Sequence, residues 1–543
     1  MISIHRSYSL SGIILLAALM GCASTHRFSP PEPLPPDNYD IPPPEARKSG
    51  GYAQYFERQF TDQVEQAFDL SRHLRKLAGK PKQAYNCNAF DEVENSTWFT
   101  NRNHVRPMTV EEIARGPNTG DGPDTTNIWT IIRAKNQGIT PGFVIEDARG
   151  DRYLIKFDPK GYPELATGAE VVSTKLFYAL GFNVPENYIT YFRPEQLRLG
   201  ENVTFTDEKG RKRPMRQEDI DAILAKVDTL SDGRIRALAS KYLPGKPLGP
   251  FSFKGTRDDD PNDLIPHEHR RELRGLRVMA AWLNHFDTKD DNTLDMYVEE
   301  NGRHFVRHYL IDFGSTLGSA AYGPNELWRG HEHMIDPNRM LANLFSLGLL
   351  VRPWEKQTPK IHPSVGYFEA ELFHPHKYKA QMPNPAFENM TNLDAFWATK
   401  IIMSLTEEQI AAAVKAGQYS DPAAEQYILK TLLKRREKIA RFYYRRVNCL
   451  DKFRLVTDEE GIALTFIDLA VEAGLEDPLT TEYRYRIRED GRLIGSGILP
   501  GSTPRVPLAK TVQVAAGSEG HSQWEITLRI RRDKTRRWGK WVR

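Results

Sequence analysis

The chain has 543 residues, of which 40% are hydrophobic and 10% aromatic, an ordinary composition for a globular protein. This length exceeds what one compact core accommodates, so we expect two or three domains. The 74 basic and 71 acidic residues leave a formal net charge of +3, which predicts no general attraction to nucleic acid or to a membrane. Any such attraction has to come from a local patch.

The N-terminal segment has the pattern of a secretory signal. His5 and Arg6 precede an apolar run over residues 13–20, and small Gly21 follows it. A basic start, a short apolar core and a small residue are typical of such a signal, and the run is too short to span a bilayer as a stable helix. The segment therefore predicts export from the cytoplasm.

The residues at the end of this run, Leu19-Met20-Gly21-Cys22, resemble the lipobox of bacterial lipoproteins. The resemblance implies that residues 1–21 are removed and that lipidated Cys22 joins the protein to a membrane. Ala23 follows in place of an aspartate, which implies the outer membrane of a Gram-negative host, facing the periplasm or the exterior. An uncleaved anchor, or a cysteine that follows a signal by chance, is the alternative.

The next segments are extended and then helical. Residues 29–45 are rich in proline, which favours a semi-rigid spacer, and we expect a tether over residues 22–50. From Gly51 to about Leu74 apolar residues recur at helical spacing. Residues 85–125 are rich in Asn, Thr, Gly and Pro and predict an irregular wrap. Residues 51–125 are thus expected to form an N-terminal extension.

A β-rich segment follows. Residues 167–180 carry a helical apolar stripe capped by Gly181, and residues 193–233 form a polar insertion with a hairpin at Lys209-Gly210 and a short helix at 220–227. The predicted strands are 128–134, 143–147, 153–157, 187–192 and 235–243.

Helical patterns dominate from residue 266 to about 448, after a proline- and glycine-rich stretch, 244–250, that predicts a hinge. Pro266 is expected to start a helix that runs to Leu283, and another helix is expected over 424–447. Alternation then predicts strands at 463–469, 482–489 and 524–530, with a hairpin at Asp490-Gly491. We expect a small β domain over 450–543.

Two acidic residues and an amide are expected to meet in the middle of the chain. Asp287 and Asn292 lie on the loop after the helix from Pro266, and Asp312 ends a strand of the hairpin 294–311, which turns at Asn301-Gly302. Phosphoryl transfer needs hard oxygen ligands for metal ions and a carboxylate that accepts the proton of the attacking hydroxyl. This grouping predicts phosphotransferase chemistry, whereas a plain polar turn is the structural alternative.

The motif His285-x-Asp287-x-Lys289-x-x-Asn292 resembles the catalytic loop of protein kinases, and Asp312-Phe313-Gly314 resembles their metal-binding motif. Residues 311–318 are also similar to the matching stretch of phosphatidylinositol 3- and 4-kinases. The resemblance implies that Asp287 orients the acceptor beside Lys289, that Asn292 and Asp312 hold Mg²⁺, and that ATP is the phosphate donor.

The family pattern also implies partners upstream. Lys156, in the apolar strand 153–157, would bind phosphate, and Glu170 in the following helix would support it, with Glu164 as the competing candidate. Gly138 and Gly142 bound a turn whose amides would approach phosphate, although a full Gly-x-Gly-x-x-Gly is missing, as is common in atypical kinases such as the HipA and CotH types. Taken alone, Lys156 could equally be a solvent-facing strand lysine.

The resemblance covers roughly residues 125–320 and implies an α+β, two-lobed protein-kinase-like fold. Its β-rich N-lobe would span 126–245 and its helical C-lobe 246–449, with the C-terminal all-β domain added. We expect an envelope-anchored enzyme that moves the γ-phosphoryl group of ATP to an unknown protein, lipid or sugar. A kinase-fold adenylyl or other transferase, and a non-catalytic pseudokinase or scaffold, are the alternatives, because free ATP is scarce outside the cytoplasm.

Other metal or redox signals are weaker. The pairs His267/His269, His331/His333 and His374/His376 are two residues apart, whereas helical metal ligands are three or four apart, so satisfied or surface histidines are expected. Cys87 and Cys449 form either one disulfide or two separate thiols.

Overall fold

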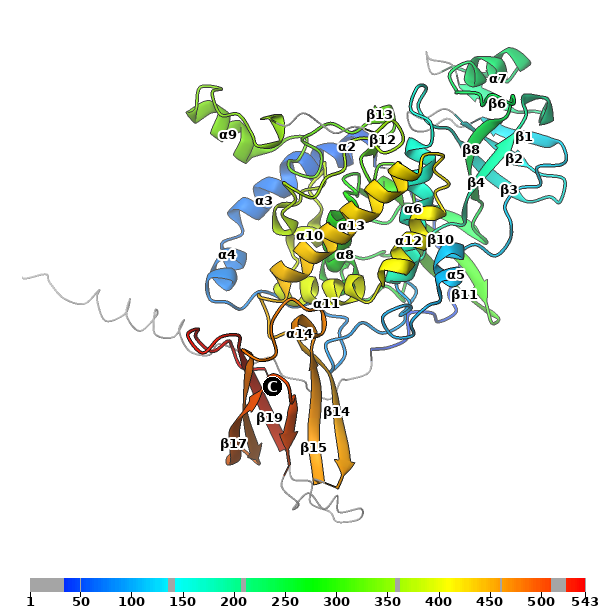
Figure 1. Ribbon diagram of the computed structural model, residues 1–543. Helices are drawn as coiled ribbons and strands as arrows, with labels where there is room; N and C mark the ends of the chain where they lie inside the picture. The colour runs from blue at the N-terminus through cyan, green and yellow to red at the C-terminus, as the bar shows by residue number, and fades with distance from the viewer. Residues whose placement is uncertain are drawn as a thin grey trace, which may run out of the picture.

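The computed structural model describes residues 34–48, 50–134, 142–206, 211–356, 362–459, 461–508 and 524–542. The protein combines helices with several sheets, and the largest sheet contains both parallel and antiparallel neighbours (Figure 1). Cys22, Gly138 and the expected turn at Lys209-Gly210 lie outside the described residues.

The largest sheet has six strands in the order β4-β8-β3-β2-β1-β5. Its neighbours are antiparallel except for β1 and β5, which are parallel. The strands expected between residues 128 and 243 are confirmed, and β5 is an additional short one. The bounds are β1 (Trp129–Ala134), β2 (Gly142–Glu146), β3 (Arg152–Lys156), β4 (Asn187–Phe192), β5 (Leu197–Leu199) and β8 (Ile235–Lys241).

The polar insertion beside this sheet is small. It holds the hairpin β6 (Thr204–Thr206) and β7 (Lys212–Pro214), followed by α7 (Gln217–Leu224). Helix α7 begins earlier than its apolar spacing predicted, because Asp219 accepts a hydrogen bond from the backbone N–H of Arg216 and fixes the first turn there.

Helix α6 (Leu165–Leu180) is buried along almost its whole length, and it ends where Gly181 adopts a φ of +116°. Its apolar residues join the largest hydrophobic core, together with α8 (Arg271–Leu283), α11 (Asn392–Met403) and α13 (Pro422–Tyr443). A separate core lies against the six-stranded sheet. Helix α6 therefore connects the sheet-rich and helix-rich parts of the protein.

A second sheet has the order β11-β10-β9, with β9 (Lys246–Gly249), β10 (Thr293–Glu300) and β11 (Arg303–Leu310). The hairpin of β10 and β11 was expected, but the stretch interpreted as a hinge contains β9, which pairs with β10. This pairing fits an edge strand, because the missing N–H of Pro247 then costs no hydrogen bond between strands. Leu248 of the same strand is fully buried. The stretch predicted as a hinge therefore contains an edge strand over residues 246–249.

The helical segments depart from the expected bounds at several ends. The pattern at 51–74 breaks at Asp69 instead of forming one helix, and the helix expected from Pro266 starts with a 3-10 turn at His267–His269 before α8. The remaining helices and short strands are α2 (Gly51–Phe56), the π-helical turn η1 (Glu57–Thr61), α3 (Asp62–Phe68), α4 (Leu70–Leu77), α5 (Val110–Arg115), α9 (Pro337–Phe345), α10 (Pro385–Glu388), α12 (Glu407–Lys415), β12 (Ser319–Ala320) and β13 (Gly323–Pro324).

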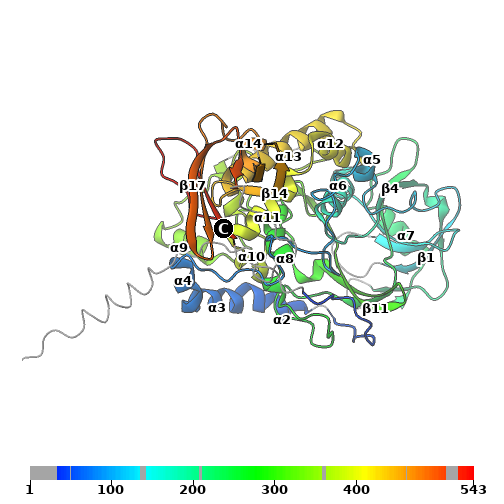
Figure 2. The same ribbon diagram turned by 90° about the horizontal axis from the view of Figure 1, so that it is seen from below.

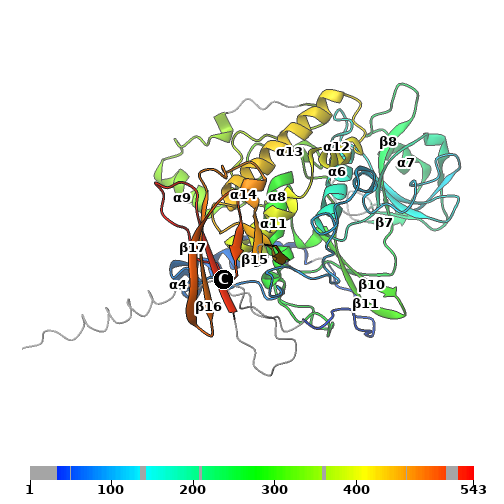
Figure 3. The same cartoon turned by 60° about the horizontal axis from the view of Figure 1, so that its bottom comes forward.

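The C-terminal strands form two further three-stranded sheets at the end of the protein away from β1–β4 (Figures 1 and 3). Apolar residues of both sheets, Tyr483 and Val506 among them, share one core. The one-turn helix α14 (Leu469–Glu472) stands between the sheets in sequence. The strands are β14 (Leu450–Asp458), β15 (Gly461–Asp468) and β18 (Arg505–Pro507) in one sheet, and β16 (Glu482–Glu489), β17 (Arg492–Pro500) and β19 (Trp524–Arg531) in the other.

Cys87 and Cys449 are free thiols, so they do not pair with each other. Burial raises the pKa of each thiol to about 12, which keeps both in the neutral form. The structure therefore has two separate thiols and not the disulfide between Cys87 and Cys449.

Residues 37–47 follow the protein surface, although a spacer was expected up to residue 50. Asp37 accepts from the Thr97 N–H and hydroxyl, Ile41 is buried, and its N–H donates to His304 O at 2.9 Å. Proline favours an extended backbone, and an extended backbone can pair along a hairpin edge as well as span a gap. A free spacer can therefore include only residues before Asp37.

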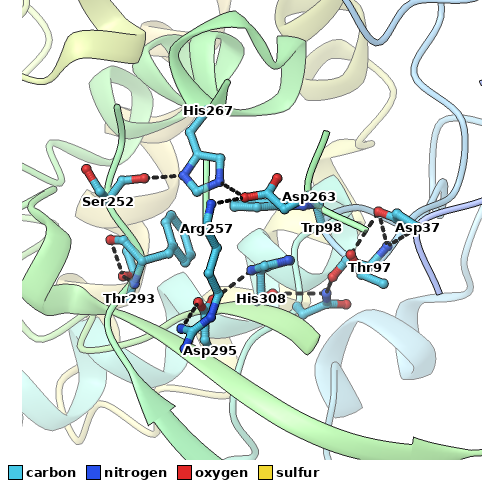
Figure 4. Close-up of polar contacts among 12 residues, drawn as sticks. Asp37, Thr97, Trp98, Ser252, Arg257, Asp263, His267, Thr293, Asp295 and His308 are labelled. Atoms are coloured by element: carbon cyan, nitrogen blue, oxygen red, sulfur yellow. Dashed lines mark hydrogen bonds and ion pairs between the residues drawn. The ribbon is translucent and has the colours of Figure 1, made fainter. Parts of the chain in front are cut away.

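A buried polar network supports this edge (Figure 4). Asp295 accepts from Arg257 at 3.1 Å and lies 2.7 Å from His308 Nδ1, while Asp263 lies 2.7 Å from His267 Nε2. The Trp98 ring stacks on His308 with 3.5 Å between centroids. Each buried charge in this network thus has a partner, which offsets its desolvation.

Candidate functional site

Lys156 is the centre of the candidate site. It ends β3, opposite Gly142 of β2 in the sheet register. Its Nζ lies 3.0 Å and 3.1 Å from the two carboxylate oxygens of Glu170, and 3.0 Å from Asp312 Oδ1. Burial opposes the charge on Lys156, but the charges of Asp312 and Glu170 outweigh it and raise the pKa of the lysine. Lys156 is thus a cation held between two carboxylates rather than a solvent-facing residue.

The structure distinguishes the two glutamates considered as partners of Lys156. Glu164 accepts instead from the Ser420 N–H at 3.0 Å and from the Ser364 hydroxyl at 3.3 Å. Glu170 is one turn and a half further along α6 and points to the β3 lysine. Glu170 is therefore the partner, and Glu164 joins α6 to later segments of the chain.

The segment that carries Asp312 is fixed against α6. Asp312 has a φ of +62°, an uncommon backbone conformation for a residue other than glycine. The next ring, Phe313, stacks on Phe177 of α6 at 5.0 Å, and Thr316 Oγ1 lies 2.7 Å from Ser173 Oγ. These contacts couple the position of Asp312 to the helix that carries Glu170.

His285 lies in the same packed region, with its ring centroid 5.6 Å from that of Phe313. Burial lowers the pKa of His285 to about 4, so the imidazole is neutral near neutral pH. His285 therefore packs in this region as a neutral ring.

Asp287 is held by three donors. Lys289 Nζ lies 3.1 Å from its Oδ1, Asn292 Nδ2 donates to its Oδ2 at 3.0 Å, and Gln381 donates to Oδ1 as well. Burial raises the pKa of Asp287, and the charge of Asp312 adds to this, whereas Lys289 and Asn292 act in the opposite direction. A carboxylate with a raised pKa that remains hydrogen-bonded suits a residue that accepts a proton.

Two further residues hold the loop that carries Asp287 and Asn292, and sequence reasoning missed both. Gln381 donates to Asp287 and accepts from Arg329 through its amide oxygen. Arg58, from η1, lies 3.0 Å from Asp290 and 2.6 Å from Asp62. Neither residue belongs to a local motif, because each reaches the loop from a distant part of the chain.

The donor set fits a magnesium ion that also binds phosphate oxygens. Asn292 uses its amide N–H₂ on Asp287, which leaves a carbonyl oxygen as ligand, and the Asp312 side chain is 53% exposed. Among the described residues no group of three or more His, Cys, Asp and Glu side chains is arranged to bind a metal. Magnesium usually takes one or two protein oxygens together with substrate phosphates and water, so this small set is sufficient.

The residues of the histidine pairs contact protein groups or lie at the surface, as expected, with His374 and His376 exposed. His331 stacks on Trp354, His333 Nδ1 lies 2.7 Å from Ala380 O, and His376 stacks on Phe442. His267 is bound by Asp263, as described above, and His269 contacts Arg274. These contacts leave the histidines with structural roles.

A cavity of about 350 Å³ borders the catalytic loop. Lys289 and Gln381 line it, and both also contact Asp287. Its other walls come from the N-terminal helices, through Tyr55 and Arg58, and from residues 382–384. The cavity therefore lies next to the carboxylate that would accept the proton.

No family model matches the chain, and no curated protein matches it. Solved structures that resemble it include a proinflammatory kinase of Helicobacter pylori, CtkA, at 13% identity and a TM-score of 0.33, over 59% of this chain and 96% of that one. The Golgi casein kinase matches at 11% identity and a TM-score of 0.27, over 76% and 95%. The same kinase with Mn/ADP bound matches at 11% and 0.23, over 72% and 91%. The contacts of the site itself, rather than these likenesses, support the function proposed below.

Proposed function

We propose that the protein is a kinase-like phosphotransferase that uses ATP and Mg²⁺. The observation that carries this proposal is the position of Lys156, whose Nζ contacts both Glu170 and Asp312 at about hydrogen-bond distance. The sheet-rich part with β1–β4 would act as the N-lobe, and the helices around α8 would act as the C-lobe. The proposal gives each charged residue of the site a task in one reaction.

Each residue acts on a stated atom. Lys156 holds phosphate oxygens of the donor, and Glu170 fixes the lysine. Asp287 accepts the proton of the acceptor hydroxyl as the new O–P bond forms and the bond between the γ-phosphorus and its bridging oxygen breaks, with ADP as the leaving group. Asn292 and Asp312 would hold Mg²⁺, which neutralises phosphate charge. Lys289 stabilises the ionised form of Asp287.

The acceptor side of the site would be the cavity beside Lys289. The Lys156–Asp312 cluster lies near Asp287, because the charge of Asp312 raises the pKa of this carboxyl. Lys289 and Gln381 line the cavity and contact the same carboxyl. A hydroxyl that enters through the cavity meets the carboxylate after a small movement of Gln381. Protein, lipid and sugar hydroxyls all remain candidates.

We also propose where the protein lies in the cell. The lipobox at Cys22 supports attachment to the cell envelope by a lipid, with the outer membrane as the expected site. Within the described part of the chain, no helix is both long and apolar enough to cross a membrane.

The test is thermal unfolding of the full chain with and without ATP and Mg²⁺, combined with phosphate transfer from labelled ATP to envelope fractions. A ligand that binds the folded state raises the unfolding temperature. We expect this rise in the wild type and in Asp287→Asn, but only the wild type should transfer phosphate. Asp312→Ala should lose both.

The alternatives give different results in the same assay. Binding without transfer in the wild type would support a pseudokinase scaffold. Transfer of the nucleotide label, instead of the γ-phosphate label, would support an adenylyl transferase. No stabilisation by any nucleotide would remove the phosphotransferase assignment.

A further inference from the structure

Apolar side chains are exposed along the N-terminal helices. They recur at every fourth position through α2, η1 and α3 and continue on one face of α4. Two of them, Phe68 and Leu77, are 78% and 85% exposed. The exposed set is Phe56, Phe60, Val64, Phe68, Leu70, Leu74 and Leu77. In a helix this spacing places side chains on one face, and every member of this set is at least 40% exposed.

A second exposed apolar group lies on α9 and the loop that follows it. Phe345 is 83% exposed and Leu347 86%. The set is Met340, Leu341, Leu344, Phe345, Leu347 and Leu349. We call these two groups together the α4–α9 surface.

The two groups belong to neighbouring segments. Gln63 Nε2 of α3 donates to Ile335 O at 3.1 Å, just before α9 begins, and the Tyr55 hydroxyl lies 2.8 Å from Met334 Sδ. Figures 1 and 2 show α9 and the blue helices α3 and α4 on the same side of the protein, and in Figure 1 α3 lies between the other two. Exposed apolar area on this scale marks an interaction site in a soluble protein.

Basic residues lie along the α4 side of this surface. Residues 70–82 contain five basic side chains, Arg72, Arg75, Lys76, Lys80 and Lys82, and no acidic one. Residues 337–351 contain no acidic residue either. The nearest acids of α3 are engaged elsewhere, since Glu65 pairs with Lys254 and Asp69 caps α4. Other acids beside the surface pair with its arginines, Glu388 with Arg72 and both Glu332 and Glu355 with Arg339. The α4–α9 surface is therefore apolar, with an excess of basic residues along its α4 side.

We infer that the α4–α9 surface docks on an anionic phospholipid bilayer. Apolar side chains on a basic amphipathic helix insert at the boundary between headgroups and acyl chains. Each Lys or Arg near an anionic surface adds to the binding, which favours an anionic membrane over a neutral protein groove. The inference does not depend on phosphotransfer.

The surface would also set how the protein faces the membrane. The segment from Cys22 to Asp37 can span up to ~50 Å when extended, so a lipid at Cys22 alone would leave the orientation open. One acyl anchor plus a polybasic patch gives stable attachment where either alone is weak. Tyr55 and Met334, which join the two halves of the surface, also line the cavity beside the catalytic loop. Docking would bring that cavity close to the lipid headgroups.

The test is hydrogen exchange of the full chain, mixed with vesicles of pure phosphatidylglycerol or of pure phosphatidylcholine. We expect amides of α4 and α9 to exchange more slowly with phosphatidylglycerol only. The combined variant Lys76→Glu, Lys80→Glu, Lys82→Glu should lose this protection, as should Phe345→Asp with Leu349→Asp. The matched control, Leu455→Asp with Ile498→Asp, removes exposed apolar residues of β14 and β17 and should keep it.

Each remaining outcome overturns the inference. Equal exchange with both vesicles, or equal protection by both, would exclude an anionic membrane as the partner. Protection that rises with protein concentration in the absence of vesicles would identify a second copy of the chain as the occupant. Thermal midpoints of the variants verify folding, and because the substituted side chains are exposed, these midpoints should match the wild type.

Discussion

Lys156 Nζ and Asp312 Oδ1 lie 3.0 Å apart, although 156 residues separate them in sequence. The contact joins the end of β3 to the segment that follows β11 and so fixes the sheet-rich part of the protein against the helix-rich part at the candidate site. Because Glu170 contacts the same ammonium, one lysine pairs with two carboxylates. The stability of the protein and the geometry of the site therefore depend on the same side chain.

Replacing this lysine should affect both properties. Lys156→Met leaves the Glu170 carboxylate buried without its cation, and breaking a buried pair in this way costs about 3 kcal/mol of unfolding free energy. The rise in unfolding temperature with ATP and Mg²⁺ should also disappear. Denaturant unfolding and the thermal assay measure the two effects. Lys430→Met, at an exposed position of α13, is the control and should change neither. A fully stable Lys156→Met that still binds nucleotide would contradict both the role and the geometry.

The pH dependence of transfer should report Asp287. Its pKa is raised, so the proton-accepting form should be lost, as pH falls, at a higher pH than for an ordinary aspartate. Lys289 lowers this pKa through its charge. Lys289→Met should therefore move the acidic limb of kcat/KM to higher pH, whereas Lys289→Arg, which keeps the charge, should leave the limb close to its wild-type position. A limb that moves in the opposite direction in Lys289→Met would exclude Asp287 as the proton acceptor.

The core of the site could be predicted from the sequence because its residues lie in short motifs. Asp287 and Asn292 share one loop, and the hairpin of β10 and β11 returns the chain to Asp312. Lys156 and Glu170 lie on a strand and the next helix, and these elements are visible in the apolar pattern. Local spacing and the order of elements located these residues, and the resemblance to kinases implied their roles.

The parts that were missed depend on contacts between distant segments. Gln381 belongs to an irregular stretch whose sequence has no periodic signal, and it acts through Asp287, 94 residues earlier. The docking of residues 37–47 and the pairing of β9 were hidden by prolines, which are compatible with a free spacer, a hinge or an edge strand. Composition alone does not choose among these.

Acid should destabilise the protein through buried imidazoles. Burial lowers the pKa of His104, His285 and His331 to about 4 each. As pH falls below about 6.5, these histidines bind protons in the unfolded chain before they do so in the folded protein. The free energy of unfolding therefore decreases from that pH down to about 4. His331→Phe keeps a ring against Trp354 and should reduce the slope of unfolding free energy against pH by about one proton. His73→Phe, at an exposed position, should leave the slope unchanged, and an unchanged slope in His331→Phe would show that this imidazole titrates normally.

Arg58 should link the N-terminal helices to the catalytic loop. Arg58→Met removes the buried guanidinium that contacts Asp62 and Asp290, while Lys254 stays 3.1 Å from Asp62, and we expect about 3 kcal/mol less unfolding free energy together with slower phosphate transfer. Burial already raises the pKa of Asp290, and Arg58 lowers it, so in the variant it should rise further. A carboxyl with a raised folded-state pKa stabilises the protein at low pH and loses that contribution as pH rises through this pKa. The loss of unfolding free energy in Arg58→Met should therefore be larger at neutral pH than in acid.

Urea unfolding at both pH values measures this loss, with Arg198→Met on β5 as the exposed control. If Arg58→Met were as stable as this control at neutral pH, the N-terminal helices would not support the loop.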